Sequence, residues 1–105
     1  MVHKVASKEE FDDQMAQAGG KLVVVDFFAT WCGPCVRIAP KLEAMDAEMV
    51  DVVFLKVDVD ECEELSTEHQ ISSMPTFIYF KNGEQVARFS GASEAKIKET
   101  IEAHL

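Results

Sequence analysis

The sequence of 105 residues is poor in cysteine, proline and most aromatic types, with three cysteines, three prolines, one tryptophan and one tyrosine. Three cysteines are too few for the disulfide framework of a small secreted scaffold, and an odd number cannot all pair within one chain. Apolar runs are also short, and none reaches the length of about 20 residues that a membrane-spanning helix needs. We therefore expect neither a disulfide-stapled fold nor a transmembrane segment.

Positive charge is scarce as well: ten Lys and Arg stand against nineteen Asp and Glu, which gives a formal net charge of −9. Binding to nucleic acid or to an anionic membrane needs a basic face, so we expect neither as a partner. With 48% hydrophobic and 28% charged residues the composition is that of a globular protein. The length predicts a single domain over residues 1–105.

The first eight residues, from Met1 to Lys8, contain no apolar core of the kind found in signal peptides. The expected location is therefore cytoplasmic. In a reducing compartment, two closely spaced cysteines are more typical of a catalytic or metal-binding site than of a structural disulfide.

Hydrophobic runs and helix-boundary residues predict the order helix, strand, helix, strand in the first half. Ser7 and Glu10 form a capping box, which predicts a helix that ends at the glycine pair 19–20. The run from Leu22 to Phe28 predicts a strand buried on both faces, as in a parallel sheet. The next elements are a helix from the loop at residues 30–34 to about Met49, with a kink at Pro40, and a strand over residues 52–57.

The second half predicts a short helix over residues 61–69, with Asp60 as its N-cap. A hairpin follows, in which the Asn82-Gly83 turn joins strands over residues 76–80 and 85–89. A last helix begins near Ser93. Together these elements predict an α/β fold, with a central mixed β-sheet flanked by helices on both faces.

The string Cys32-Gly33-Pro34-Cys35 lies between a buried strand and a helix. At a helix N-terminus, unpaired N–H groups and the dipole favour an anion, which makes the reactive thiolate of Cys32 available. Cys35 lies one turn further on the same face. Gly33 keeps the turn open, and Pro34 needs no amide donor there. This spacing predicts reversible dithiol–disulfide exchange.

The alternative for this pair is half of a zinc site, which needs about four ligands. The other residues of ligand type are Cys62, His3, His69 and His104, and none forms a second ligand pair. We therefore predict no metal. A structural disulfide is disfavoured in a reducing compartment.

Asp26 interrupts the buried strand, and burial raises the pKa of a carboxyl group. Because the strand leads into the cysteine loop, Asp26 could lie behind Cys35 and exchange a proton with it. The alternative is a buried ion pair with Lys56 of the neighbouring strand. The residues alone leave these two interpretations open.

Seven strings closely resemble the thioredoxin family, in its cytosolic animal form, over essentially the whole chain. These strings are Val25-Asp26-Phe27, Ala29-Thr30-Trp31-Cys32-Gly33-Pro34-Cys35, Ile38-Ala39-Pro40, Val57-Asp58-Val59-Asp60, Met74-Pro75-Thr76-Phe77, Lys81-Asn82-Gly83 and Ser90-Gly91-Ala92. The resemblance implies a thioredoxin fold and a general protein disulfide reductase.

The resemblance also implies roles for individual residues. Cys32 would be the nucleophile, Cys35 the resolving thiol, Asp26 the buried acid–base group and Lys56 an auxiliary residue. Pro75 would follow a cis peptide bond. The client-binding groove would be formed by Trp31, Gly33, Pro34, Met74, Pro75, Thr76, Gly91 and Ala92.

The sequence departs from the family at a few positions. Val36, followed by Arg37, stands where Lys is common, which removes one positive charge beside the site. His69 and Ser73 stand where some animal members carry extra cysteines, so regulatory oxidation or disulfide-linked dimers are not implied. For Cys62, we favour a small buried core residue over a redox role.

By the same resemblance, thioredoxin reductase, an NADPH-dependent flavoenzyme, recycles the protein, which itself needs no bound cofactor. Expected clients include peroxide-scavenging and reductive biosynthetic enzymes, with roles in electron transport and cell redox homeostasis. The implied state is a monomer or weak dimer in the cytoplasm, and in the nucleus as well. One alternative is a thioredoxin-fold regulatory module that grips partners through the same groove. Another is an oxidant or isomerase, which usually carries a more polarising dipeptide than Gly33-Pro34.

Overall fold

A computed structural model describes residues 1–105 as a five-stranded mixed sheet between two pairs of helices. The strands are β1 (His3–Val5), β2 (Leu22–Phe28), β3 (Val52–Asp58), β4 (Thr76–Lys81) and β5 (Glu84–Ser90). The helices are α1 (Lys8–Ala18), α2 (Gly33–Glu48), α3 (Glu63–Glu68) and α4 (Glu94–His104). None of the helices is long and apolar enough to cross a membrane.

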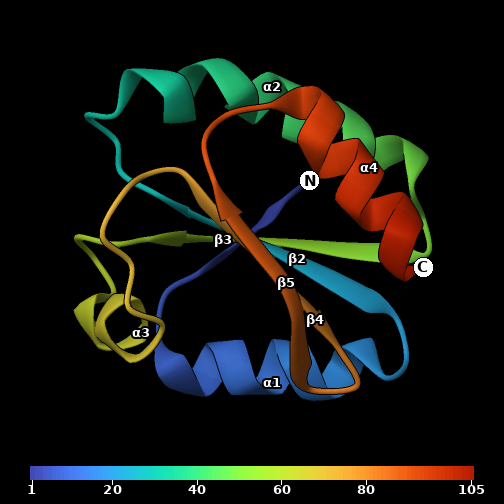
Figure 1. The fold of residues 1–105 in the computed structure, drawn as a ribbon. Helices are drawn as coiled ribbons and strands as arrows, with labels where there is room; N and C mark the ends of the chain where they lie inside the picture. The colour runs from blue at the N-terminus through green and yellow to red at the C-terminus, as the bar shows by residue number, and fades with distance from the viewer.

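The strand order is β1-β3-β2-β4-β5, which places β2 at the centre of the sheet. β1 and β2 both run parallel to β3, whereas β4 runs antiparallel to β2 and to β5. Helices α2 and α4 lie on one face of the sheet, and α1 and α3 lie on the other (Figure 1). The predicted mixed sheet with helices on both faces is therefore confirmed.

Two hydrophobic clusters, one on each face, hold the layers together. Side chains alternate along β2, so that Leu22 and Val24 pack toward α2 and α4, whereas Val23 and Val25 pack toward α1 and α3. The central strand is therefore apolar at nearly every position, as a strand buried on both faces must be. Asp26 is the exception in this run.

The predicted helix boundaries are confirmed at α1. Ser7 caps it through its side chain, whose Oγ accepts a hydrogen bond from the Glu10 amide at 3.1 Å. The reciprocal half of the capping box is absent, because the Glu10 carboxylate instead bonds His3 Nε2 at 2.8 Å. Helix α2 continues through Pro40 to Glu48. In the hairpin turn, Asn82 and Gly83 both have positive φ, as predicted for this turn type.

Two predictions about the elements are wrong. No strand was predicted at β1, which has three residues and forms by pairing with β3, in the register Lys4 to Lys56. Helix α3 begins at Glu63, and Cys62, not Asp60, is its N-cap residue. Asp60 lies before the cap position, and its carboxylate accepts a hydrogen bond from the Trp31 indole.

Candidate active site

The two motif cysteines are joined by a disulfide at the N-terminus of α2. Cys32 is the N-cap residue, and its Sγ accepts a hydrogen bond from the Cys35 amide at 3.3 Å. Their Cα atoms are 5.3 Å apart, which lies within the ordinary range for a disulfide. Because a helix N-terminus stabilises an anion, the same geometry favours the thiolate of Cys32 once the disulfide is reduced. The structure therefore brings together the pair that the sequence predicted.

Asp26 lies beneath the helix that carries the cysteines. It points to the same side of β2 as Leu22 and Val24, which is the side covered by α2. Its side chain is 5% exposed, and its Oδ1 has no hydrogen-bond partner. Burial raises the pKa of Asp26 to about 7, because the charged carboxylate loses its hydration, and Lys56 opposes this shift. An acid with this pKa can both hold and release a proton near neutral pH.

The alternative interpretation, a buried ion pair between Asp26 and Lys56, is not realised. The two residues are in register on β2 and β3, but their side chains form no ion pair within 4.0 Å. The Lys56 ammonium instead lies 5.9 Å from the centre of the Phe28 ring. Lys56 therefore acts on Asp26 only through its charge.

The connection before β4 brings a backbone carbonyl against the disulfide. The Met74–Pro75 peptide bond is cis, which confirms the expectation drawn from the family resemblance. The Met74 carbonyl oxygen lies 3.5 Å from Cys32 Sγ. The Gly91 amide donates to the Pro75 carbonyl at 2.9 Å, with Gly91 at a φ of 110° that side chains rarely allow. These contacts place Met74 against Cys32 and tie Gly91 to Pro75, the next residue of the same connection.

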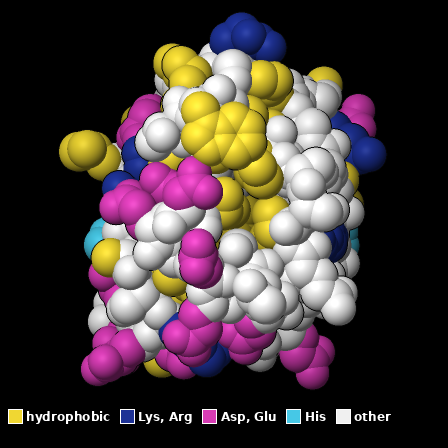
Figure 2. Space-filling model, turned by 90° about the vertical axis from the view of Figure 1, so that its left-hand side faces the viewer, with side chains coloured by type: hydrophobic (Ala, Val, Ile, Leu, Met, Phe, Trp, Pro, Cys, Tyr) yellow, Lys and Arg dark blue, Asp and Glu magenta, His cyan; other side chains and the backbone are white.

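Trp31 forms an exposed apolar feature beside the disulfide, with 69% of its surface accessible. Its Nε1–H donates to Asp60 Oδ2 at 2.9 Å, which ties the indole to the segment after β3. Val36 is 60% exposed. Figure 2 shows hydrophobic side chains gathered on the end of the molecule that carries the cysteine loop, with acidic side chains beside and below them. The end of the molecule that carries the disulfide therefore combines an apolar surface with an acidic margin.

The other predicted groove residues have different surroundings. Gly33, Pro34 and Ala92 are exposed. Thr76 is only 1% exposed, and its hydroxyl is used inside the protein, where it bonds the Ser73 carbonyl at 2.7 Å. Thr76 therefore stabilises the connection before β4 from inside the protein, and its side chain is not accessible to a client.

Sequence reasoning missed the placement of Arg37 and of Asp60. A β-carbon at Gly33 would lie 3.1 Å from Arg37 Nη1, so the guanidinium folds back over the cysteine loop. Arg37 therefore places a positive charge beside the site, although Val36 supplies none. The spacing of four residues between Gly33 and Arg37 is the signal that could have shown this contact. The bond from Asp60 to Trp31 joins residues 29 apart and leaves no such signal.

Cys62 is buried at 6% exposure, in the cluster that packs against α1 and α3. The disulfide belongs to a different cluster with Ala29. Burial as a small core residue is therefore confirmed for Cys62. The structure contains no group of three or more His, Cys, Asp or Glu side chains that could hold a metal ion.

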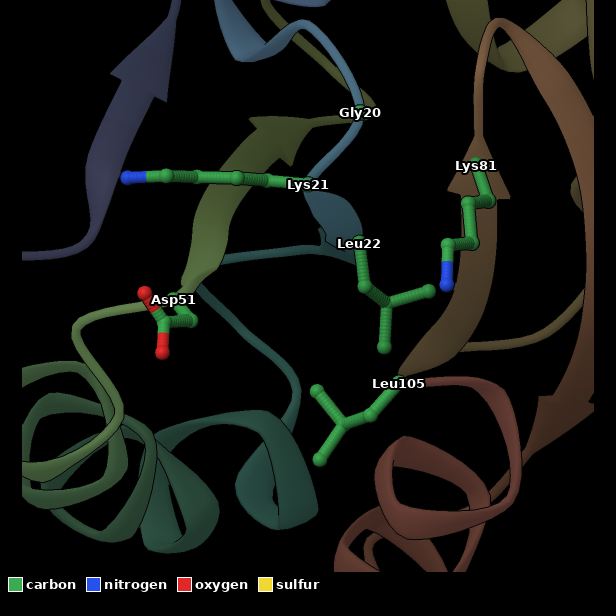
Figure 3. Close-up of a pocket in the computed structure, with 6 residues that line it drawn as sticks. All are labelled: Gly20, Lys21, Leu22, Asp51, Lys81 and Leu105. Carbon is green, nitrogen blue, oxygen red and sulfur yellow. The ribbon is translucent and has the colours of Figure 1, made fainter.

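Two surface pockets differ in their relation to the site. A pocket of about 260 Å³ adjoins Cys35. It is lined by Phe28, Ala29, Thr30, Cys35, Val36 and Ala39. The larger pocket, of about 510 Å³, lies where β2 begins, at the opposite end of that strand from the cysteine loop (Figure 3). Its two lysines are already engaged, since Lys21 Nζ donates to the Val50 carbonyl at 3.4 Å and Lys81 Nζ to the His104 carbonyl at 3.1 Å.

Comparisons with known proteins agree with this geometry. The family model described as Thioredoxin matches residues 2–103. Thioredoxin of Callithrix jacchus is 48% identical over 101 residues, and that of Homo sapiens is 46% identical, with 96% of each chain covered in both cases. The X-ray structure of Fasciola hepatica thioredoxin has a TM-score of 0.97 at 46% identity, and the match covers 99% of this chain and 100% of that one. The chain belongs to the thioredoxin family.

Proposed function

We propose that Cys32 and Cys35 act in a fixed order, with Asp26 as the group that accepts the Cys35 proton. The protein is a disulfide reductase that works by dithiol–disulfide exchange, as its family and the joined cysteine pair establish. The observation that carries the proposed order is the position of Cys32 as the N-cap of α2, one turn before the more deeply buried Cys35. The N-cap sulfur is the one that the helix dipole activates.

The reaction begins with the reduced protein and a client disulfide. The Cys32 thiolate attacks one client sulfur, so that a mixed disulfide forms and the other client sulfur leaves as a thiolate. Cys35 then loses its proton to the Asp26 carboxylate and attacks Cys32 Sγ. The bond between Cys32 and the client breaks, the second client thiolate leaves, and the Cys32–Cys35 disulfide remains. The client gains two electrons, and the cysteine pair loses them.

Asp26 suits this role because of its burial and its empty hydrogen-bonding capacity. A pKa near 7 lets the carboxylate accept the Cys35 proton without being fully protonated beforehand. Its unpartnered Oδ1 is free to form a hydrogen bond with Cys35 or with an intervening water molecule. Lys56 adjusts this balance through its charge alone.

The client would lie on the apolar surface around the disulfide. Trp31 and Met74 supply apolar contact, and the backbone beside Pro75 runs next to Cys32. We assign Gly33, Pro34, Gly91 and Ala92 to the same surface, with Thr76 as its internal support. An extended client segment that pairs with the backbone before Pro75 would bring its own sulfur to Cys32.

We further propose that residues 1–105 act as one domain and that the protein binds no cofactor of its own. Thioredoxin reductase would return electrons from NADPH through its flavin. Peroxide-scavenging and reductive biosynthetic enzymes are the proposed clients. The proposed location of this electron transfer is the cytoplasm, and the nucleus as well. The chain would work as a monomer or weak dimer.

A coupled assay tests the proposal: NADPH oxidation is followed with thioredoxin reductase, this protein and a protein disulfide as substrate. We expect turnover by the native protein, none by Cys32→Ser, and full turnover by the matched variant Cys62→Ser. Cys35→Ser should accumulate a client joined covalently to Cys32, visible by mass spectrometry. Turnover by Cys32→Ser would contradict the assigned nucleophile, and no turnover by the native protein would favour the regulatory-module alternative.

A further inference from the structure

Arg88 links the edge strand β5 to the connection that carries Met74 and Pro75. Its Nη1–H donates to the His69 carbonyl, and its Nη2–H donates to the Gln70 carbonyl at 2.8 Å. Both acceptors lie at the C-terminal end of α3, where the last carbonyls have no partner within the helix. A planar guanidinium can bond two such carbonyls at once, and its charge is favourable at that end of a helix.

Of the two residues held by Arg88, His69 is itself fixed to the core. The His69 Nδ1 atom bonds the Leu65 carbonyl at 2.9 Å, and its ring lies 5.5 Å from the ring of Phe27 and 5.6 Å from that of Phe11. Gln70 has a φ of 54°, so the chain turns sharply there. Arg88 therefore closes a turn of which one side is anchored among aromatic rings.

Further contacts from β5 and the residue after it hold the end of the same connection. Ser90 Oγ bonds Thr76 Oγ1 at 2.8 Å, and the Gly91 amide donates to the Pro75 carbonyl at 2.9 Å. Between these contacts and the Arg88 contact lies Met74, whose carbonyl faces Cys32 Sγ. The position of Met74 against the reactive sulfur thus depends on both ends of the connection.

We propose that Arg88 is a positioning residue for client binding: it holds the 69–75 connection in the arrangement that presents Met74 to a client beside Cys32. The inference rests on the proposed function, in which the client pairs with the backbone before Pro75. Without Arg88, binding would have to order the connection, which costs affinity. The chemistry of the sulfurs, which are held by α2, would be unchanged.

Steady-state kinetics with two substrates test this role. Arg88→Met keeps the aliphatic stem and removes the donors. For a protein disulfide, we expect its KM to rise roughly threefold to tenfold at constant kcat, as for the loss of one or two hydrogen bonds. For a small aromatic disulfide, which needs no backbone pairing, the rate should stay within about twofold. The KM of Arg88→Lys for the protein disulfide should lie between those of the native protein and Arg88→Met, because lysine keeps the charge but not the paired donors of the guanidinium.

The matched control is Lys98→Met, which removes a surface cation paired with Glu94 on α4. This variant should have native kinetic parameters with both substrates. Amide hydrogen exchange at Ile71 and Met74 should be faster in Arg88→Met, with exchange at Val24 unchanged. An unchanged KM for the protein disulfide, or equal slowing with both substrates, would overturn the inference. Failure of the proposed function is distinguishable, because then the native protein would not reduce the protein disulfide.

Discussion

Asp26 and Lys56 face each other in register across β2 and β3, yet no ion pair joins their side chains. The carboxyl group is therefore buried with no direct countercharge, and its pKa rises to about 7. Ionising this carboxyl group is therefore less favourable in the folded protein than in the unfolded chain. This single relationship links the proposed proton carrier to the stability of the fold.

Replacing Asp26 by Asn should stabilise the folded protein at alkaline pH. The pKa of Asp26 is 3.8 in its unperturbed state and about 7 when folded, so the folded state binds the proton more tightly. The native protein should therefore lose stability as the pH rises from about 4 to about 7, by roughly 4 kcal/mol in total. Asp26→Asn removes this loss. Urea unfolding of the oxidised native protein and of Asp26→Asn at about pH 4 and pH 8 measures this loss of stability. Identical pH dependence in the two proteins would contradict a buried, unpaired acid.

The same substitution should slow the reductase reaction near neutral pH. Asparagine cannot accept the Cys35 proton, so the second displacement should slow by roughly tenfold or more. The first displacement, by Cys32, should change little. Single-turnover kinetics separate the two steps, because Asp26→Asn should accumulate the mixed disulfide whereas the native protein should not. A native rate for the second step would exclude Asp26 as the proton carrier.

Asp60 should hold the Trp31 indole in its client-binding position. Asp60→Leu removes the acceptor of the 2.9 Å hydrogen bond, whereas Asp60→Asn keeps an oxygen there. We expect kcat/KM for a protein disulfide to fall roughly threefold in the leucine variant and to stay near native in the asparagine variant. Trp31 is the only tryptophan, so its fluorescence reports directly on the indole. An unchanged emission spectrum in Asp60→Leu would argue against this coupling.

Cys62 should be inert toward thiol reagents in the folded protein. Its side chain is buried in the core and belongs to a different cluster from the disulfide. Thiol titration of the oxidised protein should detect no reactive group before denaturation and one afterwards. Cys62→Ala should cost about 1 kcal/mol of stability and leave reductase activity unchanged. A rapidly reacting thiol in the native state would revive a redox role.

Local sequence signals predicted most elements because their causes are local. The Ser7 cap and the Asn82-Gly83 turn depend on residues close in the chain, and both appear as predicted. Strand β1 was missed because three residues carry almost no periodic signal, and only pairing with β3 makes them a strand. The N-cap of α3 was misassigned because the helix begins at Glu63, three residues after Asp60, whose carboxylate bonds Trp31, 29 residues away.

By itself, the sequence determined the cysteine pair at a helix N-terminus and the interruption of a buried strand by Asp26. Both follow from residue type and spacing, which act over a few positions. Only the tertiary structure decided what those residues face: Met74 against Cys32, Lys56 in register with Asp26 but unpaired, and Arg88 on the end of α3. Such contacts join residues brought together by strand register and layer packing, so no local pattern records them.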